Sequence, residues 1–188
     1  MPFFDTSLFY GAKFGRESID AVLAQKFGDT RLKNLLRPCL ITAYDVDNRT
    51  THLFRQHRAA HQEEYDFAVK DMCSATSAAP TYFPPVNIVN GNGIEYTLVD
   101  GGVVLNNPVL SAYSEVRKAV IAHGPEEDPK ELSAKDMFVL SLGTGSIKKE
   151  YKYDKIKNWG KAQCAIPIID VLMSGSAETM DYLTKKIF

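Results

Sequence analysis

The chain has 188 residues and a formal net charge of −1, with 45% hydrophobic and 24% charged residues. This is ordinary composition for one globular domain with a sizeable core, and it excludes a wholly disordered chain. The near-neutral charge provides no global attraction to nucleic acid or to an anionic membrane, so any such contact has to come from a local patch.

The sequence shows no sign of secretion or of disulfide cross-linking. The first residues contain neither the basic stretch nor the apolar run of a signal peptide. Three widely spaced cysteines, Cys39, Cys73 and Cys164, match no metal-binding or redox spacing, so we expect reduced thiols in an intracellular setting. We therefore expect a soluble, cytoplasmic protein whose contacts with membranes, if it makes any, are peripheral.

The first half of the sequence predicts two helices with a β-hairpin between them. Apolar residues recur at helical spacing over residues 19–27 and again over residues 65–79, where Pro80 stops the pattern. Residues 39–44 and 50–54 have the composition of strands and are separated by turn-forming residues, which is typical of a hairpin.

A β-rich run over residues 94–99 leads into the main candidate for a functional residue. Asp100 is followed by Gly101 and Gly102, which have no Cβ atom, so the backbone can turn sharply and a partner can approach the carboxylate. An Asp-Gly pair is also one of the commonest turn dipeptides. Taken alone, this stretch leaves both a catalytic carboxylate and a plain turn open.

The second half predicts a helix, a buried strand and a helical tail. Asn107 and Pro108 are typical of a helix start, and apolar residues continue at helical spacing to residue 120. Residues 137–142 are nearly all apolar, as in a strand buried between helix layers of a parallel sheet. A helical tail is expected over residues 170–187, so the whole pattern predicts an α/β fold without a clear domain boundary.

Three blocks of the sequence resemble the patatin-like phospholipases. They are Ser-Ala-Ala-Pro-Thr-Tyr-Phe-Pro-Pro at residues 77–85, Asp-Gly-Gly with Asn-Asn-Pro within residues 100–108, and Ser-Leu-Gly-Thr-Gly at residues 141–145. Their order and spacing make the match specific, and the similarity covers roughly residues 5–185. The resemblance implies a three-layer α/β/α sandwich of the patatin type with a mostly parallel sheet.

In this family a Ser-Asp dyad hydrolyses lipid acyl esters, and the resemblance implies that Asp100 is the general base, with Gly101 and Gly102 as its supporting motif. A serine hydroxyl is a weak nucleophile until a base removes its proton, which an aspartate with the ordinary pKa of about 3.9 does poorly. The dyad therefore needs a desolvated carboxylate within hydrogen-bond reach of the serine, and N–H donors for the oxyanion. By resemblance, Tyr82 and Phe83 would form the wall of an acyl groove.

The chain departs from the family pattern because it contains neither a Gly-X-Ser-X-Gly elbow nor a Gly-Gly-Gly-X-Arg-Gly oxyanion loop. In the family both blocks lie upstream of the matching region. Residues 1–188 are therefore expected to form a single patatin-like domain that lacks the nucleophile segment, is incomplete at its N-terminal side, and is inactive by itself. Three explanations stay open: a piece of a longer polypeptide, a second chain that supplies the serine, and a truncated non-catalytic descendant.

The expected function is that of a serine lipid acyl hydrolase, of the phospholipase A or lysophospholipase kind, acting on membrane or micellar glycerolipid. No metal or other cofactor is expected, because backbone donors stabilise the oxyanion. One alternative is a catalytically inactive patatin-fold fragment that acts as a lipid-binding or protein-interaction module. Another is an esterase for soluble esters.

One short stretch is both basic and aromatic, and it includes Lys148, Lys149, Lys152 and Trp159. It forms either a solvated loop or a surface that contacts anionic lipid headgroups. Nucleic acid is not an expected partner, because the stretch is short and the rest of the chain is slightly acidic.

Overall fold

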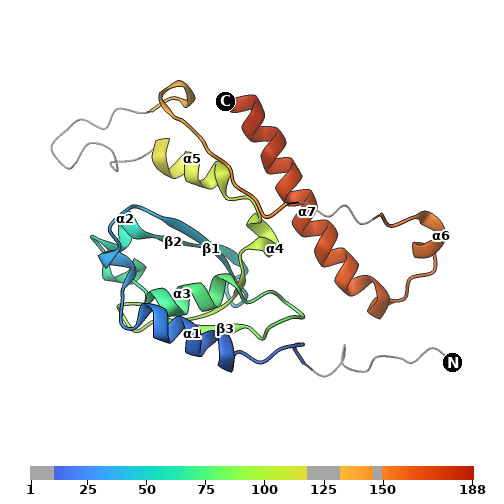
Figure 1. Cartoon of the computed structure of the whole chain (residues 1–188), viewed down its shortest axis with the longest axis horizontal. Helices are drawn as coiled ribbons and strands as arrows, with labels where there is room; N and C mark the ends of the chain where they lie inside the picture. The colour runs from blue at the N-terminus through green and yellow to red at the C-terminus, as the bar shows by residue number, and fades with distance from the viewer. Residues whose placement is uncertain (1–10, 118–131, 146–149) are drawn as a thin grey trace. The chain divides into compact units, whose positions relative to one another are not determined.

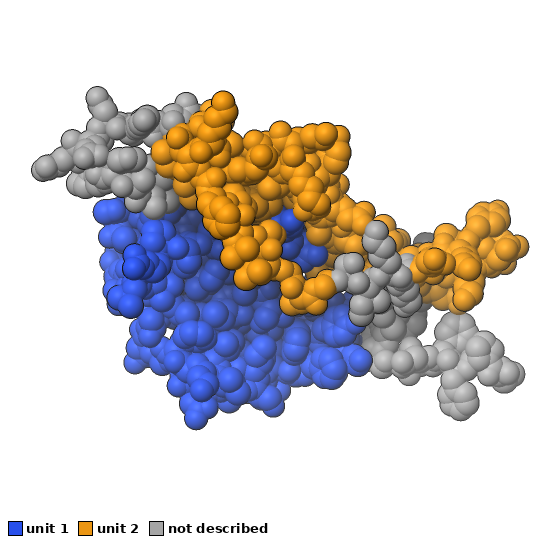
Figure 2. Space-filling view, turned by 45° about the horizontal axis from the view of Figure 1, so that its top comes forward, with its two compact units in different colours: residues 1–108 blue, residues 109–188 orange. Residues whose placement is uncertain are grey.

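The computed structural model describes residues 11–117, 132–145 and 150–188 (Figure 1). Two compact units divide the chain, the first ending at Pro108 and the second beginning at Val109, and Figure 2 colours them separately. The sheet and the candidate site belong to the first unit, so this unit carries most of the argument about function.

The first unit combines a four-stranded sheet with helices. Its elements, in chain order, are α1 (Glu17–Phe27), η2 (Leu32–Asn34), β1 (Leu40–Asp45), β2 (Thr50–Arg55), α2 (Gln56–Ala59), η3 (Glu63–Tyr65), α3 (Val69–Thr76), β3 (Val86–Val89), β4 (Glu95–Asp100) and α4 (Gly102–Leu105). α3 contacts β1, β3 and β4, so it packs on the sheet, and α1 packs on α3 (Figure 1). The predicted α/β class is confirmed.

The strands follow the order β2-β1-β4-β3, and each neighbouring pair is antiparallel. β1 and β2 form a hairpin that begins with Leu40 opposite Arg55. Ala43 of β1 lies opposite Asp100, the last residue of β4. The candidate carboxylate is therefore carried by an interior strand at the point where that strand ends.

The expectation of a mostly parallel sheet is wrong for the described strands. For two of the three strand pairs the physical reason lies in the connections, because short turns join β1 to β2 and β3 to β4. Two strands joined by a short turn can only pair antiparallel, whereas a parallel pair requires a crossover of about a dozen residues or more. The sheet is also open, with β2 and β3 as its edges.

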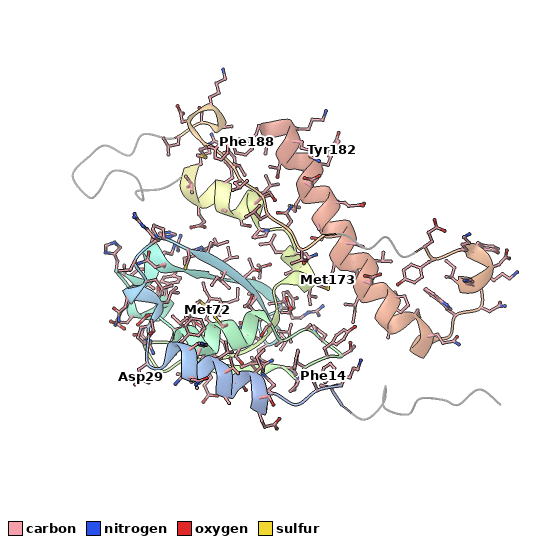
Figure 3. All side chains as sticks on the ribbon, viewed as in Figure 1. Phe14, Asp29, Met72, Met173, Tyr182 and Phe188 are labelled. Atoms are coloured by element: carbon pink, nitrogen blue, oxygen red, sulfur yellow. The ribbon has the colours of Figure 1, made fainter. Side chains whose placement is uncertain are left out.

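The core of the first unit lies between α3 and the sheet. Val69, Met72 and Ala75 recur at helical spacing on α3 and are buried, and Figure 3 labels Met72 on this helix. From the sheet, Phe54 and Leu98 are buried in the same cluster. Burying a large apolar side chain contributes about 1.5–3 kcal/mol, so these contacts hold α3 on the strands.

The predicted helix over residues 19–27 is present as α1, and the predicted hairpin is present as β1 and β2. The second predicted helix is shorter than its apolar pattern, because only residues 69–76 are helical in α3. The strand β3 and the four-residue helices α2 and α4 were not predicted. Elements this short span too few residues for a periodic pattern to stand out.

The second unit contains α5 (Val109–Arg117), η4 (Ala134–Asp136), α6 (Tyr153–Ile156) and α7 (Lys161–Ile187). The helix predicted after Asn107 is α5, but its predicted extension to residue 120 falls outside the described residues. The predicted tail is part of α7, which contacts α5. The rings of Tyr113 and Phe188 meet with centroids 5.2 Å apart, and Figure 3 labels Phe188. Neither α7 nor any other helix of the described residues is long and apolar enough to cross a membrane.

The strand predicted over residues 137–142 is wrong, because these residues are not in a strand. Phe138 is 90% exposed and Leu142 is 85% exposed. An extended segment becomes a strand only when a neighbour takes its backbone hydrogen bonds, and the described residues of this unit contain no strand. None of these described residues is buried, so they build no core of their own.

Candidate active site

Asp100 is held at the end of β4 by backbone contacts on two sides. Its register partner on β1 is Ala43, and its own N–H donates a hydrogen bond of 3.0 Å to the Ala78 carbonyl. Because Ala78 follows α3 in the chain, the backbone of Asp100 is tied both to the sheet and to the segment after that helix. These contacts therefore fix the backbone position from which the Asp100 side chain extends.

The carboxylate of Asp100 is anchored through one of its two oxygens. The N–H of Gly102, the first residue of α4, donates a hydrogen bond of 2.7 Å to Oδ1. Within the described residues, Oδ2 accepts no hydrogen bond. A carboxylate held in this way keeps one oxygen available as a proton acceptor.

The surroundings of Asp100 make it a stronger base than an exposed aspartate. Burial raises the pKa of Asp100 above its ordinary value, and the hydrogen bond from Gly102 opposes this increase without cancelling it. A general base works best when its pKa is close to the working pH. The direction of this shift is therefore the one that proton abstraction near neutral pH requires.

The two glycines after Asp100 are needed for different reasons. Gly101 lies against β1, where a Cβ atom would overlap with both the hydroxyl and the carbonyl oxygen of Thr42. Its φ of −65° and ψ of −23° are ordinary helical values, so close approach rather than an unusual dihedral angle demands glycine. Gly102 is buried and supplies the N–H that holds the carboxylate.

Asp100 lines a cavity of about 310 Å³, which is at the small end of the range for ligand pockets. The other lining residues come from β1, from the end of α3 and from the segment after β4: Leu40, Ile41, Thr42, Thr76, Gly102, Leu105, Asn106 and Pro108. Asp100 is the single titratable side chain in this set. The cavity can therefore hold a partly apolar group beside one carboxylate.

No serine lines the cavity, so the described residues place a base there without a nucleophile. Ser77 follows Thr76 in the sequence, but its hydroxyl donates hydrogen bonds to the backbone of α3 instead. The sequence pointed to Asp100 but missed Thr42 and Thr76 as its neighbours. No local pattern could have identified them, because β1, α3 and β4 meet only in the folded unit.

Tyr82 and Phe83, which were predicted to line an acyl groove, are not among the cavity residues. The structure places them beside Phe14, which Figure 3 labels. The ring centroid of Phe14 lies 6.4 Å from that of Tyr82 and 5.9 Å from that of Phe83. The Phe14 N–H donates a hydrogen bond of 2.8 Å to the Tyr82 carbonyl, which holds the two segments together. Their contact with an acyl chain stays a prediction.

The basic and aromatic stretch is only partly described. Lys148 and Lys149 lie outside the described residues. The Nζ of Lys152 lies 3.7 Å from a carboxylate oxygen of Glu150. The ring of Trp159 packs against that of Tyr151, with centroids 5.4 Å apart. Contact of this stretch with anionic lipid stays a prediction.

The part of the chain that the structure describes contains no cluster of candidate metal ligands. No group of three or more His, Cys, Asp or Glu side chains there is arranged to hold a metal ion. Among the described residues, Cys39, Cys73 and Cys164 form no disulfide, and each is partly buried.

The whole candidate site lies within the part of the chain that matches a known family. The sequence model of one family, described as patatin-like phospholipase, matches residues 2–113. The matched range contains Asp100, its two glycines and every residue that lines the cavity. The Ser-Leu-Gly-Thr-Gly block at residues 141–145 lies beyond it.

Two similar proteins are found in Arabidopsis thaliana and Solanum tuberosum. Patatin-like protein 1 of Arabidopsis thaliana is 33% identical over 193 residues, which cover 96% of this chain and 47% of that protein. Patatin-01 of Solanum tuberosum is 32% identical over 197 residues, with 97% of this chain and 49% of that protein covered. The chain thus spans about half the length of these relatives. Together with the family match, this similarity shows that the chain belongs to the patatin-like phospholipase family.

Proposed function

We propose that this chain contributes the general base of a serine lipid acyl hydrolase, of the phospholipase A or lysophospholipase kind. The observation that carries the proposal is the state of Asp100, which is the single titratable side chain of its cavity and is anchored through one oxygen only. Membership of the patatin-like phospholipase family supports the class of reaction.

In this reaction Asp100 accepts the proton of a serine hydroxyl while the serine oxygen attacks the ester carbonyl carbon. The tetrahedral intermediate collapses, the alcohol leaves with the proton that Asp100 returns, and an acyl-enzyme remains. Asp100 then takes a proton from water, which hydrolyses the acyl-enzyme and frees the serine. The raised pKa of Asp100 supports both proton transfers.

The serine comes from outside the residues that line the cavity. It belongs to a preceding segment of a longer polypeptide or to a second chain, and the chain spans about half the length of its relatives. The remaining alternative is a non-catalytic descendant, in which the cavity binds a lipid or the fold binds a protein without chemistry. Labelling of a serine by a fluorophosphonate probe separates a hydrolase from such a binding module.

The substrate class that we propose is a membrane or micellar glycerolipid. Leu40, Ile41 and Leu105 give the cavity apolar walls, against which the carbon chain next to an ester group can pack. An esterase for soluble esters is the competing reading. Turnover that rises sharply when the substrate forms micelles supports the lipid substrate, whereas turnover that ignores micelle formation supports the esterase.

A cytoplasmic location with peripheral membrane contact belongs to the same proposal. The basic stretch around Lys152 and Trp159 would meet anionic headgroups with its lysines and the interfacial region with its aromatic rings. Vesicle co-sedimentation tests this surface directly. Reversing the charge of these lysines should reduce binding to anionic vesicles, and unchanged binding removes the surface from the proposal.

The base itself is tested by Asp100→Asn in the natural polypeptide that contains these 188 residues. This substitution keeps the shape of the side chain but removes the proton acceptor, so ester hydrolysis should fall by about 10²–10⁴-fold. Hydrolysis is measured with a chromogenic acyl ester and with glycerolipid micelles.

Asp71→Asn is the matched control, because burial also raises the pKa of Asp71 but this residue does not line the cavity. The control variant should keep its activity. Full activity in Asp100→Asn, or an equal loss in both variants, contradicts the assignment of Asp100 as the base.

A further inference from the structure

We propose that Thr76 is a positioning residue for Asp100, because its hydroxyl fixes the β1 backbone against which the turn after Asp100 is packed. The inference rests on the proposed function only in treating Asp100 as the base. The arrangement itself consists of contacts within the first unit, and each of them involves a residue that lines the cavity or adjoins one that does.

The first contact joins α3 to β1. Thr76 is the last residue of α3, and its Oγ1 donates a hydrogen bond of 2.7 Å to the Thr42 carbonyl. Thr42 lies one residue before Ala43, where the register of β1 with β4 ends. The Thr76 hydroxyl therefore holds the part of β1 that continues beyond its pairing with β4.

The second contact joins this part of β1 to the turn after Asp100. Gly101 lies so close to Thr42 that the hydroxyl and the carbonyl oxygen of Thr42 occupy the space of a Cβ atom. Protein interiors are close-packed and transmit small displacements. A shift of the Thr42 carbonyl therefore moves the backbone on which the carboxylate and its Gly102 donor are mounted.

The third contact is a hydrogen bond between the segment after α3 and the backbone of Asp100. The Ala78 carbonyl accepts the hydrogen bond from the Asp100 N–H, two residues beyond Thr76. Thr76 thus acts through Thr42, while Ala78 acts directly on the Asp100 backbone. Among the described residues, no other titratable or charged side chain lines the cavity, so the position and hydration of Asp100 depend mainly on these neutral contacts.

The test compares Thr76→Val, which keeps the branched shape and removes the donor, with Thr76→Ser, which keeps the donor. In Thr76→Val the Thr42 carbonyl needs water as its donor, which admits water beside Asp100. The pKa of Asp100 should then fall towards its ordinary value, and Thr76→Ser should restore the wild-type behaviour. Ser77→Ala is the matched control, because the Ser77 hydroxyl bonds only to the backbone of α3.

Two measurements on the natural polypeptide report the effect of these substitutions on Asp100. A carbon-13 carboxyl titration should show a lower midpoint for Asp100 in Thr76→Val only. The rising limb of kcat/KM against pH should move to lower pH, with kcat reduced about tenfold, while KM changes little. If Thr76→Val does not fold, Thr76→Cys replaces it, since a thiol is a weak donor and should give a smaller shift in the same direction.

An unchanged Asp100 midpoint in Thr76→Val, or equal shifts in the valine and serine variants, overturns the proposal. A loss of stability without a change in the titration also overturns it, because that result indicates a purely structural hydroxyl. The carboxyl titration does not require hydrolysis. If the polypeptide has no hydrolase activity but the midpoint moves as expected, the proposed function fails while the positioning role of Thr76 stands.

Discussion

At Gly101 the backbone of the turn after β4 lies so close to Thr42 that no side chain fits. The residue does not use the conformational freedom of glycine, since its dihedral angles are helical. Its contribution is the absence of a methyl group, which lets α4 start directly against β1. The same close packing brings Gly102 into position to hold the Asp100 carboxylate.

We therefore expect Gly101→Ala to reduce the free energy of unfolding by about 1–3 kcal/mol, the usual cost of inserting a methyl group into a packed interior. Urea denaturation followed by circular dichroism measures this loss. Gly175→Ala in α7 is the control, because nothing lies within 4 Å of its added Cβ atom. The control should be stabilised by about 0.5–1 kcal/mol, and equal destabilisation of both variants contradicts the steric explanation.

At the scale of elements, an aromatic cluster joins the two strands that flank β1. His52 of β2 lies with its ring centroid 4.6 Å from Phe54, 5.4 Å from Phe67 and 5.0 Å from Tyr96 of β4. Ala43, the register partner of His52 on the strand between them, is buried and small. The rings can therefore meet across β1, which ties β2 to β4.

This cluster makes the stability of the first unit dependent on pH. The His52 Nε2 is buried and has no hydrogen-bond partner among the described residues. Burial lowers the pKa of His52, while Asp45 opposes this decrease and Arg55 adds to it. The unfolded chain binds the proton more readily, with a pKa of about 6.5. The contribution of His52 to the free energy of unfolding should therefore be constant above about pH 7 and fall as the pH drops from about 6.5 towards the lowered value.

Thermal or urea unfolding between pH 7.5 and pH 5 checks this expectation against His52→Phe, which cannot titrate. The difference between the two proteins isolates the histidine from the carboxylates. The lowered pKa values of Asp45 and Asp66 make their contributions fall only at more acidic pH. A wild-type curve that runs parallel to that of His52→Phe rules out this source of pH dependence.

At the scale of the whole molecule, the two units differ in how they bury apolar residues. The first unit has a contiguous core, whereas no residue of the second unit whose burial is described is buried. Phe138, Leu140 and Leu142 alternate along an exposed segment of the second unit. Exposed apolar residues of this kind mark a surface that needs a partner or else drives association.

We therefore expect residues 1–188, expressed alone, to self-associate or to remain poorly soluble. Light scattering after size exclusion measures this, and replacing both Phe138 and Leu142 by Lys should raise the monomer fraction. Tyr153→Lys is the control for added charge, because Tyr153 is also exposed but lies in a different element, α6. A monodisperse wild-type chain that melts cooperatively contradicts the expectation.

The elements with a long or regular pattern were predictable from the sequence, and the irregular ones were not. α1 and the β1–β2 hairpin follow directly from apolar spacing and turn residues. The segment at residues 137–142 has an equally strong pattern but forms no strand, because no described strand pairs with it. The prediction of a parallel sheet was wrong for a related reason, since the relative direction of paired strands depends on connections that composition does not report.

For the candidate site, the sequence by itself determined the Asp-Gly-Gly block, its place at the end of a strand and its family, because contiguous residues encode all three. Only the tertiary structure decided that Thr42 and Thr76 are the neighbours of Asp100, and that burial raises its pKa. These properties depend on segments far apart in the chain, which meet only when α3, β1 and β4 pack together. The place of Asp100 in a cavity is therefore a property of the fold, whereas the identity of Asp100 is a property of the sequence.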